Sequence, residues 1–124
     1  MEQIKWDERG LVPVVGQDAE TKDVLMVAYM NKEAFDLTRE TGKAHYYSRS
    51  RKKLWLKGES SGHTQAVKAI YMDCDNDTLL IAVDQKVAAC HTGFRSCFYR
   101  AWDEGWKIVG KKVFDDKLVY GVKT

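Results

Sequence analysis

Three cysteines are the residues of this chain whose type and number are best suited to metal chemistry. Cys74 lies in the sequence Asp-Cys-Asp-Asn-Asp, and Cys90 and Cys97 bracket the sequence Cys-His-Thr-Gly-Phe-Arg-Ser-Cys. Three thiols cannot all pair as disulfides within one chain, and none of them forms a Cys-x-x-Cys knuckle. Three protein ligands with an open fourth position are typical of a catalytic zinc site, because a structural zinc site is normally closed by four.

A group of aspartates surrounds the first cysteine and adds a second kind of ligand. Asp73, Asp75 and Asp77 offer hard carboxylate oxygens, which suit magnesium or calcium. On a straight strand these carboxylates would span about 13 Å and point away from Cys74. Ligation of one ion by all three therefore requires the Asn76-Asp77 end of the segment to curl. A polar turn that leads into a strand explains three aspartates about equally well.

The segment between Cys90 and Cys97 must fold back on itself if one ion is to bind both thiols. Seven residues separate the sulfurs by about 10 Å on a helix, or place them on opposite faces of a strand. Thr92-Gly93 permits such a turn. His91 could be a ligand, a general base or a hydrogen-bond donor to a ligand. Two buried thiols and a turn histidine explain this segment better by itself, but Cys74 and the aspartates together favour a metal site.

A basic stretch precedes the cysteines and indicates anion binding. Arg49 and Arg51 are two residues apart, so a strand would place both on one face, where their guanidinium groups could bind phosphate. Gly58 and residues 60–62 (Ser-Ser-Gly) would let backbone donors approach the anion. The alternative is a solvated hairpin edge, which we favour for the two lysines that follow Arg51.

Composition and length predict one globular domain in a reducing compartment. The chain has 124 residues, 44% of them hydrophobic, and a net charge of +2, which is too small to indicate a nucleic-acid binder. The first residues lack the apolar region of a signal peptide, and the apolar runs are too short to cross a bilayer. An odd number of cysteines without a secretion signal favours a cytoplasmic protein.

Hydrophobic periodicity predicts one convincing helix among short strands. The helix covers residues 32–40, with Asn31 as its N-cap and Gly42 just beyond its end. The predicted strands are residues 12–15, 24–29, 44–47, 65–72, 78–83, 98–102 and 113–121. The turns are too closely spaced for repeated βαβ units, so the pattern favours an α+β fold with mainly antiparallel strands.

Several of these motifs, in this order, resemble the phosphoribosyl-AMP cyclohydrolases, enzymes of histidine biosynthesis. The resemblance covers residues 45 to 100 almost continuously and also includes residues 25–31. The stretches that carry it are residues 47–51, 54–65, 73–77 and 89–100. Such a set of motifs is very specific, and no departure occurs at the cysteine or aspartate positions.

The resemblance implies two metals and a shared site. A zinc ion in each subunit would be bound by Cys90, Cys97 and Cys74 of the partner subunit. A magnesium ion in each subunit would be bound by Asp73, Asp75 and Asp77. The implied fold is an open-barrel-like, mainly antiparallel sheet with one or two short helices, in an intertwined homodimer.

The resemblance also implies the reaction, which is hydrolytic opening of the N1–C6 bond in the adenine ring of 1-(5-phosphoribosyl)-AMP. His91 is then the expected catalytic residue, since three thiolates weaken the acidity of zinc and a nearby base would help. The residues expected to bind the substrate are Arg49, Arg51, Lys57, Ser60, Ser61 and His63. We expect residues 1–124 to form a single domain without a fused pyrophosphate-hydrolysing domain, and we expect neither nucleic acid nor membrane as a partner.

Two other classes of function compete with this one. A non-catalytic zinc-binding module would fold only with metal and would show no hydrolase activity. A nucleic-acid-binding domain would use the basic, aromatic-rich stretch and would bind oligonucleotides with steep salt dependence.

Overall fold

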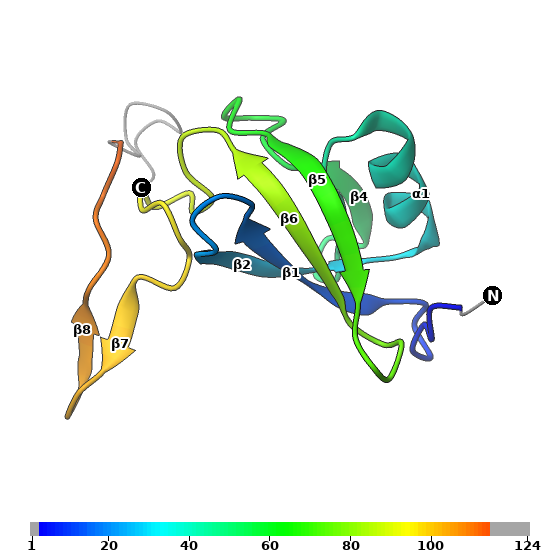
Figure 1. Cartoon of the computed structure of the whole chain (residues 1–124), viewed down its shortest axis with the longest axis horizontal. Coiled ribbons are helices and arrows are strands. Elements are labelled where there is room, and N and C mark those ends of the chain that lie inside the picture. The colour runs from blue at the N-terminus through cyan, green and yellow to red at the C-terminus, as the bar shows by residue number, and fades with distance from the viewer. Residues whose placement is uncertain (1–2, 115–124) are drawn as a thin grey trace.

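A four-stranded β-sheet and one α-helix form the centre of the fold in the computed structural model, which describes residues 3–114 (Figure 1). In chain order the elements are β1 (Val12–Asp18), β2 (Val24–Met30), α1 (Lys32–Thr41), β3 (His45–Ser48), β4 (Lys53–Leu56), β5 (Gln65–Met72), β6 (Leu79–Gln85), β7 (Arg100–Trp102) and β8 (Trp106–Ile108). The large sheet has the order β2-β1-β6-β5, and β3–β4 and β7–β8 form separate hairpins.

The large sheet is mixed, with one parallel pair at its centre. β1 pairs antiparallel with β2, and β6 pairs antiparallel with β5, whereas β1 and β6 run parallel. The parallel pair forms because the chain crosses over through α1 and the β3–β4 hairpin before β6 enters the sheet beside β1. The predicted α+β class with mainly antiparallel strands and a short helix is confirmed. Within residues 3–114 the sheet stays open, without closure into a barrel.

Side chains that alternate along the central strands supply the core. In β1 the buried residues alternate with partly exposed ones, as expected when one face of a strand is covered. Val14 of β1 and Ile81 of β6 are fully buried, and Leu25 and Met30 of β2 pack with them. Ala34 of α1 closes the cluster from the other side, so the helix covers one face of the sheet.

Helix α1 begins and ends where its capping residues predict. The side chain of Asn31 accepts a hydrogen bond from the backbone N–H of Ala34, and Gly42 has the left-handed conformation at the C-terminus. Ala34 and Thr38 form its buried face. None of the helices in the described part of the chain is long and apolar enough to cross a membrane.

A buried polar chain connects the β3–β4 hairpin to the segment that follows β6. The Tyr46 hydroxyl donates to the side chain of Gln65, and Gln65 donates to Gln85 at 2.8 Å. Gln85 in turn donates to the carbonyl oxygen of Ala88 at 3.2 Å. Burial raises the pKa of Tyr46 well above its ordinary value, so the hydroxyl stays protonated. These bonds hold the segment after β6 against the β3–β4 hairpin.

Some predicted strands differ from the observed ones. β4 and β8 were not predicted, because each is short and becomes a strand only through pairing in a hairpin. The strand predicted at residues 98–102 is shorter and begins at Arg100. For the strand predicted at residues 113–121, residues 115–121 lie outside the described part of the chain, and Val113 and Phe114 are not in a strand.

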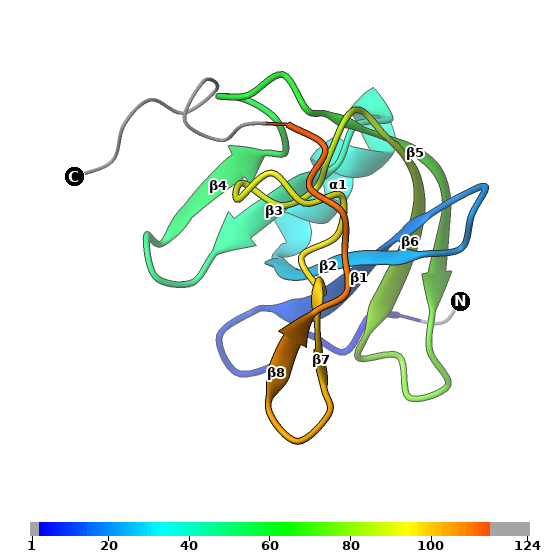
Figure 2. The ribbon, with the colours of Figure 1, turned by 90° about the vertical axis from the view of Figure 1, so that its left-hand side faces the viewer.

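The β7–β8 hairpin projects away from the rest of the fold (Figures 1 and 2). All six strand residues of this hairpin are exposed in the isolated chain. Trp102 and Trp106 pack edge to face across the hairpin and remain 67% and 69% exposed. A two-stranded hairpin is marginally stable by itself in water, so this apolar surface is suited to contact with another protein surface.

Candidate active site

An open pocket of about 840 Å³ lies between β2, the β3–β4 hairpin and the segment that follows β6. Its walls come from residues 26–29, residues 47–51 and residues 55–61, together with Ala89, His91 and Cys97. Residues that are distant in sequence therefore meet in one concave site. Such a pocket with convergent polar groups is the usual form of a small-molecule binding site.

Basic side chains dominate this pocket. Among the described residues that line it, the charged ones are Arg9, Arg49, Arg51, Lys53, Lys57 and Glu59. The guanidinium carbon of Arg49 lies 4.0 Å from the centre of the Tyr29 ring, so a cation–π contact orients this arginine. The predicted pair Arg49 and Arg51 is thus brought to the pocket. Five cations against one carboxylate suit an anionic ligand.

Arg9 is a cation of this pocket that sequence reasoning missed. It belongs to the turn before β1, and the backbone N–H groups of Arg9 and Leu11 both donate to the side chain of Asp7. No local motif connects Arg9 to the basic stretch, and only the tertiary structure brings them together. Lys53, which we interpreted as a solvated edge residue, also lines the pocket.

The loop between β4 and β5 forms another wall. Ser60 and Ser61, which were predicted to bind the substrate, line the pocket. Gly58 has φ of +89°, and a Cβ atom there would lie 2.6 Å from the backbone of His63, so the tight loop requires glycine. The N–H of Gly62 donates to the carbonyl of Gly58 at 2.7 Å and closes the turn.

His63 lies behind this loop and does not line the pocket. It is only 8% exposed, and its ring packs edge to face against Phe114 with 4.8 Å between the ring centres. Its Nδ1 atom has no hydrogen-bond partner among the described residues. Burial, with smaller effects of the Lys57 and Lys86 charges, lowers the pKa of His63.

Lys57 connects the pocket wall to the cysteine segment, which we define as residues 89–97. Its Nζ atom donates to the carbonyl oxygen of Ala89 at 2.6 Å, directly before Cys90. Burial lowers the pKa of Lys57, while the nearby Cys97 and Cys90 thiols act in the opposite direction. The ammonium group therefore faces the two thiols as well as the pocket.

The chain between Cys90 and Cys97 folds back as the paired-thiol hypothesis requires. The N–H of Gly93 donates to the carbonyl of Cys90, and the N–H of Cys90 donates to Phe94, which closes a tight turn. The two thiols interact, and partial desolvation of the Cys97 sulfur together with the neighbouring Cys90 raises the pKa of Cys97 to about 12, although the residue as a whole is exposed. The Cys90 sulfur also lies 2.8 Å from the Thr92 hydroxyl. Two soft donors thus lie side by side at the edge of the pocket.

His91 enters the same pocket immediately beside this pair. It is exposed and lines the pocket together with Cys97. The turn that brings the thiols together also sets the position of His91, because it directly follows Cys90 in the chain. His91 and the Cys97 thiol therefore line one pocket, while the catalytic role of His91 stays a prediction.

Cys74 lies in the turn between β5 and β6, whereas the other two cysteines follow the opposite end of β6. The Cys74 side chain is exposed. Seven strand residues separate the two ends of β6 by about 20 Å. Within residues 3–114 of one chain, the three thiols therefore do not form a common ligand group.

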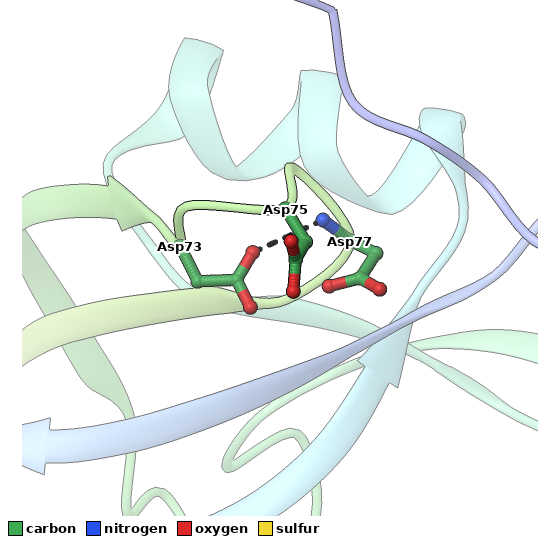
Figure 3. Close-up of side chains that lie close together, drawn as sticks. All are labelled: Asp73, Asp75 and Asp77. Carbon is green, nitrogen blue, oxygen red and sulfur yellow. Dashed lines mark hydrogen bonds between the residues drawn. The ribbon is translucent and has the colours of Figure 1, made fainter.

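The three aspartates curl into a compact cluster at the β5–β6 turn (Figure 3). Each offers a carboxylate oxygen, and these oxygens all lie within 4.8 Å of one another. Asn76 has φ of +64°, and the N–H of Asp77 donates to the Asp73 carboxylate at 3.1 Å. Desolvation acts to raise the pKa of Asp73, but hydrogen bonds with Asp77 and Thr78 outweigh it and lower the pKa. The extended geometry considered for this segment is wrong, and the curl required for shared ligation is present.

A comparison with protein families decides between the competing classes of function. The family model described as phosphoribosyl-AMP cyclohydrolase matches residues 26–99, which is more than half of the chain. The chain belongs to the phosphoribosyl-AMP cyclohydrolase family. The family prediction is therefore confirmed, and with it the prediction that the chain is an enzyme of this family. Its role belongs to histidine biosynthesis.

Relatives in archaea and bacteria share most of the chain. A phosphoribosyl-AMP cyclohydrolase of Methanospirillum hungatei is 63% identical over 117 residues, which cover 94% of this chain and 88% of the relative. One from Neisseria gonorrhoeae is 54% identical over 98% of this chain and 94% of the relative. A histidine biosynthesis bifunctional protein of Thermoanaerobacter pseudethanolicus is 55% identical over 97% of this chain but only 56% of its own length.

The matched region of the family model contains every cysteine, aspartate and basic residue predicted for the site, from Arg49 to Cys97. Arg9 lies outside the matched region although it lines the same pocket. Membership in the phosphoribosyl-AMP cyclohydrolase family favours the hydrolase over a zinc-binding module or a nucleic-acid-binding domain, because both alternatives lack a catalytic role.

Proposed function

We propose that this chain hydrolyses the N1–C6 bond in the adenine ring of 1-(5-phosphoribosyl)-AMP. The water oxygen becomes the carbonyl oxygen on C6, and N1 gains a proton as the ring opens to the phosphoribosyl-formamidine carboxamide product. The proposal rests on one observation. A single pocket combines the Cys97 thiol and His91 with a basic lining. Family membership agrees with this reading.

The basic lining would hold the two phosphates of the substrate. Arg49 is oriented by its contact with Tyr29, and Arg51 follows on the same hairpin. Guanidinium groups bind phosphate oxygens through two parallel hydrogen bonds, which hold the ligand in position as well as attract it. Ser60 and Ser61 would add hydroxyl donors from the facing loop.

His91 would handle the proton of the attacking water. It lies in the pocket beside the thiol pair, and an imidazole is the side chain whose ordinary pKa is nearest to neutral pH. A base positioned beside the water accepts its proton during attack, and the resulting imidazolium can then donate to N1 as the ring bond breaks. We assign to Lys57 a supporting role, because its Nζ already donates to the backbone beside Cys90.

Cys90 and Cys97 would hold a zinc ion together with Cys74 of the partner subunit. The two thiols already interact in this structure, and thiolate sulfur is a donor that zinc selects. When bound, zinc would lower the pKa of a water molecule toward neutrality. Coordination would also deprotonate Cys97 despite its raised pKa, because a coordinating thiol loses its proton.

A homodimer would supply the third thiol. Cys74 is too far from Cys90 to reach the same ion within one chain, since β6 separates them. In a symmetric pair of subunits each chain offers its β5–β6 turn to the other, which creates two equivalent sites. The exposed apolar β7–β8 hairpin, with Trp102 and Trp106, supports the proposal of an extensive contact between subunits.

The aspartate cluster would hold magnesium. Asp73, Asp75 and Asp77 present carboxylate oxygens within 4.8 Å, so small rotations bring them to one hard cation. Because the aspartates belong to the same turn as Cys74, the magnesium ion would lie beside the shared zinc site in the dimer. Its positive charge would then add to the basic pocket lining that faces the substrate phosphates.

A spectroscopic assay tests the proposed reaction. Ring opening of phosphoribosyl-AMP should change its ultraviolet absorbance when full-length protein is added, and prior removal of zinc with a chelator should abolish the change. Addition of zinc after removal of the chelator should restore it. Protein that contains stoichiometric zinc but leaves the substrate spectrum unchanged would refute the proposal.

A further inference from the structure

Arg95 lies inside the cysteine segment and connects it to three other parts of the fold. One amino group of its guanidinium donates to the carbonyls of Gln85 and Val87 at 2.8 and 2.9 Å. The other amino group donates to the Asp18 carboxylate at the end of β1. Since Gln85 ends β6, a single side chain joins the segment to both central strands of the sheet.

Asp18 is itself held rigidly by the β1–β2 turn. Its Oδ1 atom accepts hydrogen bonds from the N–H groups of Glu20 and Thr21 at 2.9 and 3.0 Å, while Oδ2 faces Arg95. The Asp18 side chain is only 8% exposed and that of Arg95 is 36% exposed. Only the carboxylate of this pair is shielded from water, so solvent screens the pair less than a pair of two exposed side chains, and the pair has a defined geometry.

Backbone hydrogen bonds on either side of Arg95 also fix the chain next to both cysteines. The carbonyl of Arg95 accepts from the N–H of Ala89 at 2.8 Å, directly before Cys90. Two residues after Arg95, the N–H of Cys97 donates to the carbonyl of Leu25 in β2 at 2.7 Å. Arg95 thus lies between two anchored ends, each of which carries one thiol.

We propose that the Asp18–Arg95 ion pair presets the segment so that the Cys90 and Cys97 sulfurs are side by side before metal binds. In this role both residues are positioning residues for the zinc ligands. Without the pair, the segment would have to become ordered when zinc binds, and that loss of conformational freedom would weaken the affinity. The inference rests on the proposed zinc site at these thiols.

An ordinary stabilising role is the alternative, and zinc affinity separates the two. Asp18→Asn keeps an oxygen for the Glu20 and Thr21 N–H groups but presents an amide, which cannot accept from Arg95. Arg95→Met removes the guanidinium and keeps much of the side-chain volume. Val14→Ala is the matched control, because Val14 is fully buried in the same strand as Asp18 and lies outside the cysteine segment.

The measurement is competition for zinc between the full-length protein and a chelator of known affinity, with oligomeric state checked by sedimentation. Asp18→Asn and Arg95→Met should each weaken zinc binding by about 10–100-fold, the usual range for residues that orient metal ligands. The double variant should be no weaker than the worse single variant, because both changes remove one interaction. At saturating zinc, kcat of the single variants should return to within a few-fold of the parent.

Two outcomes would overturn the inference. The first is that the two single variants, Arg95→Met and Asp18→Asn, each bind zinc as tightly as the parent. The second is Val14→Ala protein that loses zinc affinity to the same extent at an equal loss of thermal stability. A Cys90→Ser variant makes the result unambiguous, since undiminished zinc binding by that variant would refute the proposed zinc site itself instead of the role of the ion pair.

Discussion

Cys74 and Cys90 lie beyond opposite ends of the same strand, β6, so one chain cannot bring both thiols to one ion. The strand is central in the sheet and hydrogen-bonded to neighbours on both sides, which hold its two ends about 20 Å apart. Any site that uses both cysteines must therefore combine two subunits. This relationship makes the proposed shared zinc site testable without a structure of the dimer.

Mixing two inactive variants should restore activity. Cys74→Ser and Cys90→Ser should each lose bound zinc and turnover, but a mixed dimer contains one site with all cysteines intact and one site with both changes. With random exchange half of the dimers are mixed, so the ring-opening assay should recover about a quarter of the parent activity.

The control for this mixing experiment is verified subunit exchange, for example by mass spectrometry of differently labelled chains. Complete exchange without any recovery of activity would count against ligation by two subunits. Either cysteine variant that kept stoichiometric zinc and near-normal turnover by itself would show that its cysteine is not a ligand.

His91→Ala should lower kcat by roughly 10²–10⁴ while zinc remains bound, because a positioned base contributes a factor of that size. The checks are steady-state kinetics and metal analysis of the same preparation. His45→Ala is a suitable control, since His45 is not among the residues that line the pocket. A rate that falls only in proportion to lost zinc would show that His91 supports the metal site instead.

Arg49→Ala should raise KM for phosphoribosyl-AMP with a smaller effect on kcat, because it removes binding common to the ground state and the transition state. Tyr29→Leu should show a weaker version of the same effect by releasing Arg49 from its ring contact. Arg39→Ala is the matched control, since Arg39 also packs over an aromatic ring, Phe35, but does not line the pocket. Equal KM values for all three variants and the parent would exclude phosphate binding by Arg49.

Asp75→Asn should weaken the dependence of activity on magnesium and leave zinc content unchanged. The reason is that a neutral amide is a poorer ligand for a hard cation than a carboxylate, while the thiols are untouched. Magnesium titrations of activity with parallel zinc analysis provide the test, and Asp84→Asn, an exposed change on β6, is the control. Loss of zinc to the same extent as in the cysteine variants would show that carboxylates and thiols form one site.

Asp18 should make stability depend on pH in the acid range. Hydrogen bonds from Thr21 and Glu20, together with Arg95, hold the pKa of Asp18 below its ordinary value of 3.8. A carboxyl group with a lowered folded-state pKa contributes stability above its unfolded pKa, and that contribution disappears as pH falls through the folded pKa.

Asp18→Asn should therefore lower the free energy of unfolding at pH 7 by roughly 1–3 kcal/mol and should lose less stability than the parent below about pH 4. Urea unfolding at pH 7 and across the acid range measures both effects. Asp36→Asn, which breaks an exposed pair with Lys32, should have a much smaller effect at pH 7. If the free energy of unfolding fell equally steeply with decreasing pH in Asp18→Asn and in the parent, Asp18 would not be the source of the pH dependence.

The sequence by itself determined the features that depend on neighbouring residues. Asn31 and Gly42 delimit α1 because capping acts between groups three or four residues apart. The turn at Thr92-Gly93 likewise arises within a single short segment, whereas the sequence left open whether the aspartate segment is extended or curled. The family motifs, and with them the enzyme class, were also readable from the chain, because they are local patterns of residue types.

Only the tertiary structure decided which of these segments meet. The parallel pairing of β1 and β6, the arrival of Arg9 in the pocket and the contact of Asp18 with Arg95 all join residues distant in the chain. The position of His63 behind the pocket wall instead of within it depends in the same way on Phe114 and the folded loop. Such contacts depend on how buried faces pack against one another, and local pattern does not specify that packing.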